Sequence, residues 1–169
     1  MEQTQQPVQP VQPTQPQYSF PTEEVTLPSK GLLYPEGSPL RSGKITMKYM
    51  TAKEEDILTN QNYIKNGTVI DKLLQSLIVD MTKVEDLLIG DKNAILVASR
   101  ILGYGQDYTF KYPHPDTGVE EELTIDLTEA EDKLIDESKM VNGKNEFEFE
   151  LPTSKMFITF KLLTQADEK

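Results

Sequence analysis

The sequence predicts a single α+β domain preceded by a disordered tail. Apolar residues recur at helical spacing between about residues 51 and 103, and they alternate with polar residues between about 106 and 163. Residues 1–22 are instead rich in glutamine and proline. We therefore expect residues 23–169 to form an N-terminal strand and loop, a three-helix segment and two antiparallel β-hairpins.

The tail begins MEQTQQPVQPVQPTQPQ, which carries one charge and no residue that could build a core. Repeated prolines favour an extended polyproline II chain without internal hydrogen bonds. A proline-binding partner could read such a tail. The tail lacks the flanking basic or aromatic residues that would make such a site specific. We therefore favour the interpretation that the tail is a spacer.

Two short strands and a stiff loop are predicted before the helices. Residues 25–27 read as an edge strand stopped by Pro28, and residues 42–50 alternate as a half-buried strand. Between them prolines and glycines define a turning loop that contains Leu32, Leu33 and Tyr34. These three residues are candidate partner contacts. The alternative, which we favour, is that they plug the core from outside.

The first two helices have recognisable starts. Thr51 and Glu54 form a capping-box pattern for a helix that runs to about Tyr63 or Ile64. Thr68 begins the next, which shows one apolar face through residues 69–81. A short helical turn is expected at 84–89.

The third helix, Gly90 to Gly105, is apolar on almost every side, which predicts a place in the middle of the core. Asp91 is the expected cap, and Gly103 and Gly105 are the expected end. Arg100 interrupts the apolar surface, and we expect it to bond a carboxylate or backbone carbonyls that pin the helix to a loop.

Two hairpins follow, each predicted from period-two alternation. In the first, residues 108–112 and 123–127 flank a proline-rich turn; in the second, residues 147–151 pair with 156–162. Between Glu120 and Glu137 nine acidic residues accompany one lysine. A solvated strand edge is the common interpretation, and a dock for a basic surface is the alternative. The candidate contacts here are Glu120, Glu121, Glu122 and Phe157, the last on the polar side of its strand.

Composition excludes several function classes. The 17 basic and 28 acidic residues give a net charge of -11, which opposes binding to nucleic acid or anionic membranes. There is no cysteine, and no apolar run approaches a membrane span or a signal peptide. The chain ends with a helix-start pattern at Thr164 and Asp167, so we expect either an omitted C-terminal helix or a truncated copy.

Residues for catalysis or cofactor binding are not grouped in the sequence. The single histidine, His114, lies between two prolines, and with Asp116 it offers two metal ligands at best. Acidic residues occupy outward strand positions, where a catalytic pKa is not expected. We therefore predict no catalytic, cofactor or metal site. A small hydrolase that uses surface carboxylates is a distant alternative, and it requires a carboxylate buried in a cleft.

Five segments together resemble the baseplate protein family of T4-like contractile-tailed phages, whose members are assigned to assembly of the baseplate hub. They are LPSKGLLYPEGSPL, ITMKYMTAKEEDILTNQ, GTVIDKLLQSLIVD, LLIGDKNAILVASRILGYG and NEFEFELPTS, with FKLLT near the end. The resemblance implies a non-enzymatic role in hub assembly, through contacts with other baseplate or hub proteins. It also implies action in the host cytoplasm during assembly or a place in the tail baseplate, and it leaves the oligomeric state open.

One departure from the family concerns zinc. Relatives carry a Cys-x-x-Cys knuckle in the hairpin turn, where this sequence has His114 to Gly118 flanked and interrupted by prolines. Proline reduces the entropy of the unfolded loop, so we expect the turn to persist without metal. A transient chaperone and a permanent structural component of the baseplate both remain open.

Overall fold

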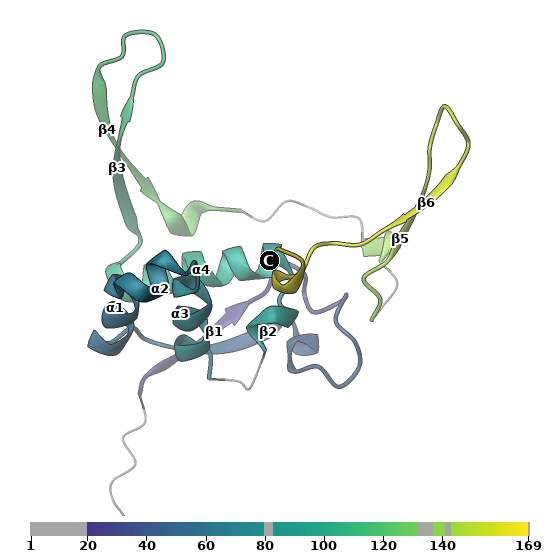
Figure 1. Cartoon of the computed structure of the whole chain (residues 1–169), viewed down its shortest axis with the longest axis horizontal. Helices are drawn as coiled ribbons and strands as arrows, with labels where there is room; N and C mark the ends of the chain where they lie inside the picture. Colours follow the sequence, from purple (N-terminus) through teal and green to yellow (C-terminus); the bar gives the residue numbers. More distant parts are fainter. Residues whose placement is uncertain (1–19, 80–82, 132–136, 141–142, 169) are drawn as a thin grey trace, which may run out of the picture.

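The computed structural model describes residues 20–79, 83–131, 137–140 and 143–168. They form a helical body from which two β-hairpins project (Figure 1). The predicted tail lies almost wholly outside the described residues, and its disorder stays a prediction.

The mixed α+β class is confirmed, with four α-helices and three two-stranded antiparallel sheets in the described part of the chain. The helices are α1 (Ala52–Thr59), α2 (Gln61–Lys65), α3 (Val69–Leu77) and α4 (Ile89–Tyr104). The strands are β1 (Thr22–Thr26), β2 (Lys44–Lys48), β3 (Asp107–Pro113), β4 (Glu120–Asp126), β5 (Phe147–Glu150) and β6 (Phe157–Phe160). Sheet pairs are β1 with β2, β3 with β4, and β5 with β6.

The core lies where β2, α3 and the loop before β2 meet. Ile45 and Met47 of β2 are fully buried, as alternation predicted, and they pack with the apolar face of α3. That face is shorter than predicted, because α3 ends at Leu77. The next residue, Ile78, forms an isolated antiparallel bridge with Met47 instead, so the chain leaves the helix beside β2.

A single first helix reaching Tyr63 or Ile64 is wrong, although its predicted start at Thr51 is confirmed. The chain breaks at Asn60, whose side-chain oxygen accepts hydrogen bonds from the backbone N–H groups of Asn62 and Tyr63 at 3.0 and 3.2 Å. Asparagine is a strong N-cap residue, and it starts α2 here. The sequence therefore carried the signal for the break.

The predicted central position of α4 is also wrong. Asp91, Ile95 and Ser99, one helical turn apart, are its buried residues, while Val97 and Tyr104 on the other side are 39% and 53% exposed. Figure 1 shows α4 along one side of the body rather than inside it. Asp91 does not cap the helix either, because the N-cap is Leu88. Of the two glycines expected to end it, Gly105 alone has a positive φ, 86°.

Candidate functional site

Two hairpins project from the helical body (Figure 1), and we name them the first arm (β3–β4, residues 107–126) and the second arm (β5–β6, residues 147–160). Both hairpins were predicted, and both are confirmed. In each arm, a strand makes its main contacts with its partner strand rather than with the helical body. An isolated two-stranded hairpin is only marginally stable in water. Packing against a partner protein would therefore stabilise each arm.

The first arm has one aromatic face. Tyr108 lies opposite Ile125, and Phe110 lies opposite Leu123, so these side chains share one side of the ribbon. Tyr108, Phe110 and Tyr112 form a row with ring centroids 5.7 and 6.2 Å apart. The other side of the ribbon is polar.

The second arm repeats this division. Phe147 stacks on Phe160 across the strands with centroids 5.3 Å apart, and Phe149 lies opposite Ile158 on the same side. Phe157 is on the opposite side, facing Glu150.

The acidic residues were expected to face outward, which left the apolar positions of both arms to face inward. The structure leaves most of these apolar positions open to solvent, while Phe110, Tyr112 and Phe147 are half-buried. Ile125 of the first arm and Phe160 of the second are 40% and 47% exposed, and Phe157 reaches 74%. Alternation identified the residues that share a face but could not show what covers that face. Contiguous apolar side chains exposed in this way mark interaction surfaces.

Arg100 fixes the first arm to the end of α4. Its guanidinium donates hydrogen bonds to the backbone carbonyls of Gly105 and Asp107 at 3.0 and 3.2 Å. It also lies over the rings of Tyr104 and Tyr108, 5.1 and 5.6 Å from their centroids. The predicted role of Arg100 in pinning the helix to the following loop is confirmed.

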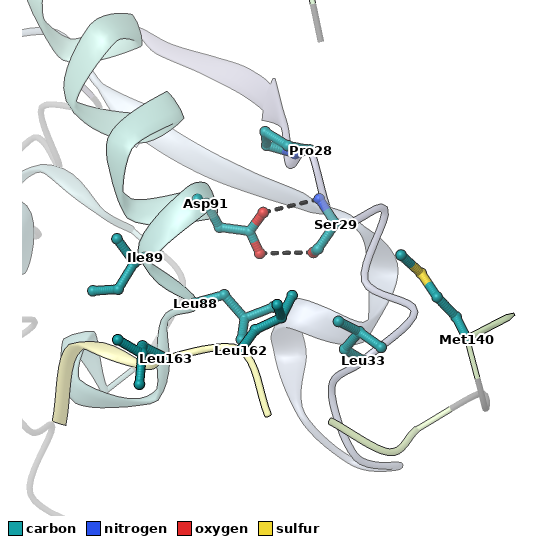
Figure 2. A pocket seen from close by; sticks show the side chains of 10 residues that line it. Pro28, Ser29, Leu33, Leu88, Ile89, Asp91, Met140, Leu162 and Leu163 are labelled. Atoms are coloured by element: carbon teal, nitrogen blue, oxygen red, sulfur yellow. Dashed lines mark hydrogen bonds between the residues drawn. The ribbon is translucent and has the colours of Figure 1, made fainter. Parts of the chain in front are cut away.

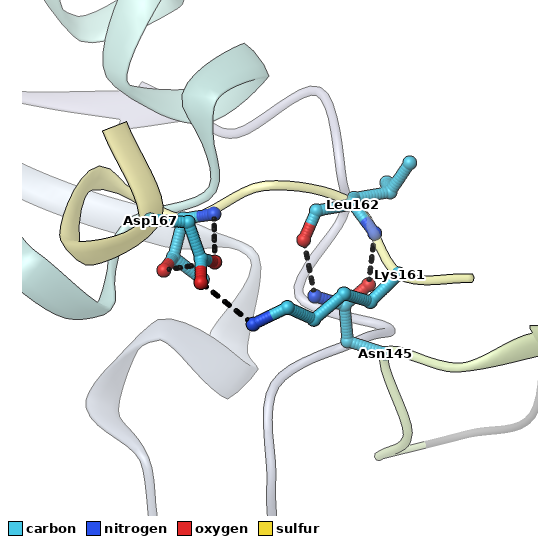
Figure 3. A network of polar contacts seen from close by, with 5 residues as sticks. Asn145, Lys161, Leu162 and Asp167 are labelled. Atoms are coloured by element: carbon cyan, nitrogen blue, oxygen red, sulfur yellow. Dashed lines mark hydrogen bonds and ion pairs between the residues drawn. The ribbon is translucent and has the colours of Figure 1, made fainter. Parts of the chain in front are cut away.

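The second arm is fixed at its base by side chains that replace a strand ladder (Figure 3). The Asn145 side chain donates to the Leu162 carbonyl at 2.8 Å and accepts from the Leu162 N–H at 2.9 Å. Asp167 accepts from Lys161 at 2.7 Å and from the Thr164 hydroxyl at 2.8 Å. The helix-start pattern at Thr164 and Asp167 was expected to have no helix after it, but a short 3₁₀ helix follows at Gln165–Glu168.

The C-terminal segment then joins the second arm to α4. The Ile89 N–H donates to the Leu163 carbonyl at 3.0 Å, and the Gln165 N–H donates to the Leu87 carbonyl at 2.8 Å. Both arms are thus attached at opposite ends of α4.

The candidate contacts on the arms are exposed. Glu120, Glu121 and Glu122 lie at the start of β4, where Glu121 accepts a hydrogen bond from the Tyr112 hydroxyl at 3.2 Å. Phe157 lies on the polar side of the second arm. Their role in binding a partner stays a prediction.

The candidate contacts on the loop are placed differently. Leu33 and Tyr34 are 3% and 5% exposed and belong to the core, while Leu32 is half-buried. The structure thus favours the interpretation that this loop plugs the core.

Tyr34 and the neighbouring loop hold a buried carboxylate, Asp91 (Figure 2). Asp91 accepts hydrogen bonds from the N–H and hydroxyl of Ser29 at 2.9 and 2.7 Å, and from the Tyr34 hydroxyl at 2.7 Å. Burial and the adjacent Asp91 carboxylate raise the pKa of Tyr34, so its hydroxyl remains a donor. This cluster ties the loop to the first turn of α4, where negative charge is favoured.

A mostly apolar cavity of about 420 Å³ lies beside this cluster, and Leu33, Leu88, Met140, Leu162 and Leu163 contribute to its wall. Asp91 is the one carboxylate among the described residues that line it. Because Ser29 and Tyr34 already donate to both oxygens of Asp91, the carboxylate is engaged in holding the fold.

The expectation that acidic residues occupy outward positions is wrong for three of them, since Glu54, Asp71 and Asp91 are buried. Each has a protein donor within the fold. Lys48 and Ser76 donate to Glu54 at 2.8 and 2.6 Å, and Gln165 donates to Asp71 at 3.0 Å. The burial of Glu54 could have been predicted from the capping box, because the Glu54 carboxylate turns back to accept a hydrogen bond from the Thr51 N–H.

Within the described residues no group of three or more His, Cys, Asp or Glu side chains is arranged to hold a metal ion. The same residues include no helix with the length and apolarity needed to cross a membrane.

The comparison with protein families decides the identity. The family model described as T4 bacteriophage base plate protein matches residues 21–169. The chain belongs to this base plate protein family. The match covers nearly the whole chain, including the body and both arms, and leaves out most of the Gln/Pro-rich tail.

No curated protein and no solved structure matches the chain. Membership in the T4 base plate family indicates a structural or assembly role in a phage tail, in association with other baseplate proteins.

Proposed function

We propose that this base plate family protein takes part in assembly of the baseplate hub through protein–protein contacts made by its two arms, without catalysing a reaction. The observation that carries the proposal is the exposed aromatic face of each arm. Folding has left apolar side chains such as Ile125 and Phe160 40% and 47% exposed, and a neighbouring subunit can cover them. The protein would act in the host cytoplasm while tails are being built.

The buried carboxylates support a non-enzymatic role. General acid–base catalysis requires a carboxylate or imidazole that can reach a substrate proton. Glu54 and Asp91 instead accept hydrogen bonds from side chains of neighbouring elements. Both carboxylates therefore stabilise the fold.

Co-expression with the baseplate proteins of the same phage, followed by affinity purification, tests this proposal. We expect at least one hub protein to co-purify. Phe149→Ser should weaken the interaction without changing the melting temperature, because Phe149 lies on the aromatic face of the second arm and is 51% exposed. Thr159→Ala, on the polar side of the partner strand, is the matched control and should bind normally. Failure of every baseplate protein to co-purify would contradict the proposal.

A permanent structural component of the baseplate is the second candidate, and the description of the family as a base plate protein favours it. Mass spectrometry of purified virions separates this candidate from a transient chaperone. A component is present in a fixed ratio to other baseplate proteins, whereas a chaperone is absent from mature particles.

A further inference from the structure

The solvent-facing side of α4 carries almost no charge, which is unusual in a chain with a net charge of -11. We define its outward face as the residues opposite the buried stripe of Asp91, Ile95 and Ser99: Gly90, Asn93, Ala94, Val97, Arg100, Ile101 and Tyr104. A helix that lies on a core normally presents several charged residues to water. The outward face of α4 presents one, Arg100, whose guanidinium is held by the carbonyls of Gly105 and Asp107.

The spacing on this face matches a helix–helix contact. Gly90, Ala94, Val97, Ile101 and Tyr104 are separated by four, three, four and three residues. This alternation is the seam of a coiled coil, in which small and apolar side chains meet those of a facing helix. An α4 of 16 residues is about 24 Å long and could seat a partner helix of similar length.

The outward face continues onto the first arm. Arg100 lies over Tyr104 on α4 and over Tyr108 on β3, and the aromatic row then extends through Phe110 to Tyr112. Because Arg100 also bonds the carbonyls of Gly105 and Asp107, the helix and the arm meet at a fixed corner. The outward face of the helix and the aromatic row of the arm therefore meet at Arg100, and Figure 1 shows the first arm rising from the end of α4 away from the helical body.

Charge decides the kind of partner. Residues 107–126 contain six carboxylates and one lysine, and Glu121 lies on the aromatic side beside Tyr112. A second copy of this chain would bring another net charge of -11 against this rim. A basic partner gains from the same charges, because complementary potentials favour encounter and register.

We propose that the outward face of α4 and the aromatic face of the first arm form one docking surface for an amphipathic helix of a basic baseplate subunit. This inference rests on the proposed function and names the chemistry of the partner. It also accounts for the composition of α4, whose outward side carries a single charged residue, because another chain would bury that side.

A photo-cross-linking experiment tests the proposal. A benzophenone amino acid replaces Val97 in the full chain, which is co-expressed with the baseplate subunits of the same phage and irradiated. We expect a cross-link to one subunit, through a helical peptide rich in lysine or arginine. The same amino acid in place of the exposed Gln61 on α2 is the control and should give no such product.

A binding measurement complements it. Val97→Glu should weaken the complex by roughly tenfold or more, because the contact would bury an unpaired carboxylate. Gln61→Glu adds the same charge elsewhere and should bind normally. Both residues are exposed, so the two variants should melt at the wild-type temperature.

The outcomes separate the two proposals. If the wild-type complex forms but Val97 cross-links to a second copy, to its own chain or to nothing, the docking surface is overturned and the hub-assembly role remains. An acidic cross-linked peptide, or normal binding by Val97→Glu, also overturns it. If no baseplate subunit co-purifies with the wild type, both proposals fail.

Discussion

Glu54 lies buried where α1, α3 and β2 meet, with no exposed surface. Its carboxylate accepts hydrogen bonds from Lys48 on β2 at 2.8 Å, from Ser76 on α3 at 2.6 Å, and from the Thr51 N–H and hydroxyl at 2.9 and 2.6 Å. Burial acts to raise the pKa of Glu54, but these donors outweigh it and lower the pKa from 4.5 to about 2. A single carboxylate thereby joins three elements of the body.

The free energy of unfolding should therefore fall as the solution is acidified. Because the pKa of Glu54 is lower in the folded than in the unfolded chain, its contribution is complete above pH 4.5 and is lost as the pH falls toward 2. The difference corresponds to about 3 kcal/mol. Urea unfolding at several pH values measures it.

Substitution isolates this contribution from that of the other acidic residues. Glu54→Gln should lower the stability at neutral pH by on the order of 3 kcal/mol and reduce the dependence on acid pH, because the half-buried Lys48 partner loses its counter-charge. Glu55→Gln changes the exposed neighbour in the same helix and should have little effect. Equal acid sensitivity in the wild type and Glu54→Gln would contradict the assignment.

Leu33 tests whether the loop before β2 is core or contact surface. Leu33 is 3% exposed, so Leu33→Ser should cost about 3 kcal/mol or more by leaving a cavity and burying a hydroxyl. The half-buried Leu32 is the matched control, and Leu32→Ser should cost about 1 kcal/mol. Thermal unfolding measures both. An unchanged melting temperature for Leu33→Ser, together with weaker co-purification, would instead make Leu33 a partner contact.

Among the elements, those with a local signal could be predicted from the sequence. Period-two alternation identified β2 and both arms, and Thr51 with Glu54 identified the start of α1. The break at Asn60 could have been predicted too, since asparagine caps helices, but an apolar pattern that continued across it favoured one helix. Burial of α4 could not be predicted, because apolarity shows that a face avoids water and does not show which chain covers it.

The loop that carries Leu33 depends on a close backbone crossing at Gly31. A Cβ at this position would lie 2.4 Å from the Arg41 carbonyl oxygen and 2.6 Å from the Gly43 nitrogen, and φ is +74°. Backbone atoms cannot move aside as a flexible side chain can, so Gly31→Ala should cost about 3 kcal/mol or more.

Gly37 provides the matched control in the same loop. Its φ is +86°, but a Cβ there would meet nothing within 4 Å. Gly37→Ala should therefore cost only about 1 kcal/mol, the penalty of the left-handed backbone. Denaturant unfolding compares the two variants, and equal losses would mean that the crossing at Gly31 is looser than the structure shows.

At the scale of the whole molecule, the sequence contained the candidate site but not its geometry. The acidic run at Glu120 to Glu122 and the outward Phe157 were recognisable as unusual surface residues. Period-two alternation placed Tyr108, Phe110 and Tyr112 on one side of a strand, but it did not show that this side lies away from the helical body. The two hairpins were foreseen, but their separation from each other and from the β1–β2 sheet was not, because sheet assembly depends on contacts between distant segments that no local period encodes.

Hydrogen exchange should distinguish the arms from the body. Backbone amides of β3–β4 and β5–β6 should exchange well before those of β1–β2 and α3, because each arm lacks the packing that protects a hairpin. The β1–β2 pair is the internal control: it is also a two-stranded sheet, but Ile45 and Met47 bury one side of it in the core. Mass spectrometry of the free protein measures this order.

Hydrogen exchange of the complex with baseplate subunits tests whether the arms are the binding surface. If baseplate subunits cover the arms, the amides of the first arm should become protected while those of β1–β2 stay unchanged, because the body is already packed. Arms as protected as α3 in the free protein would mean that they are covered before any partner binds. Arms still unprotected in a purified complex would move the interface to another face and remove the main support for binding through the arms.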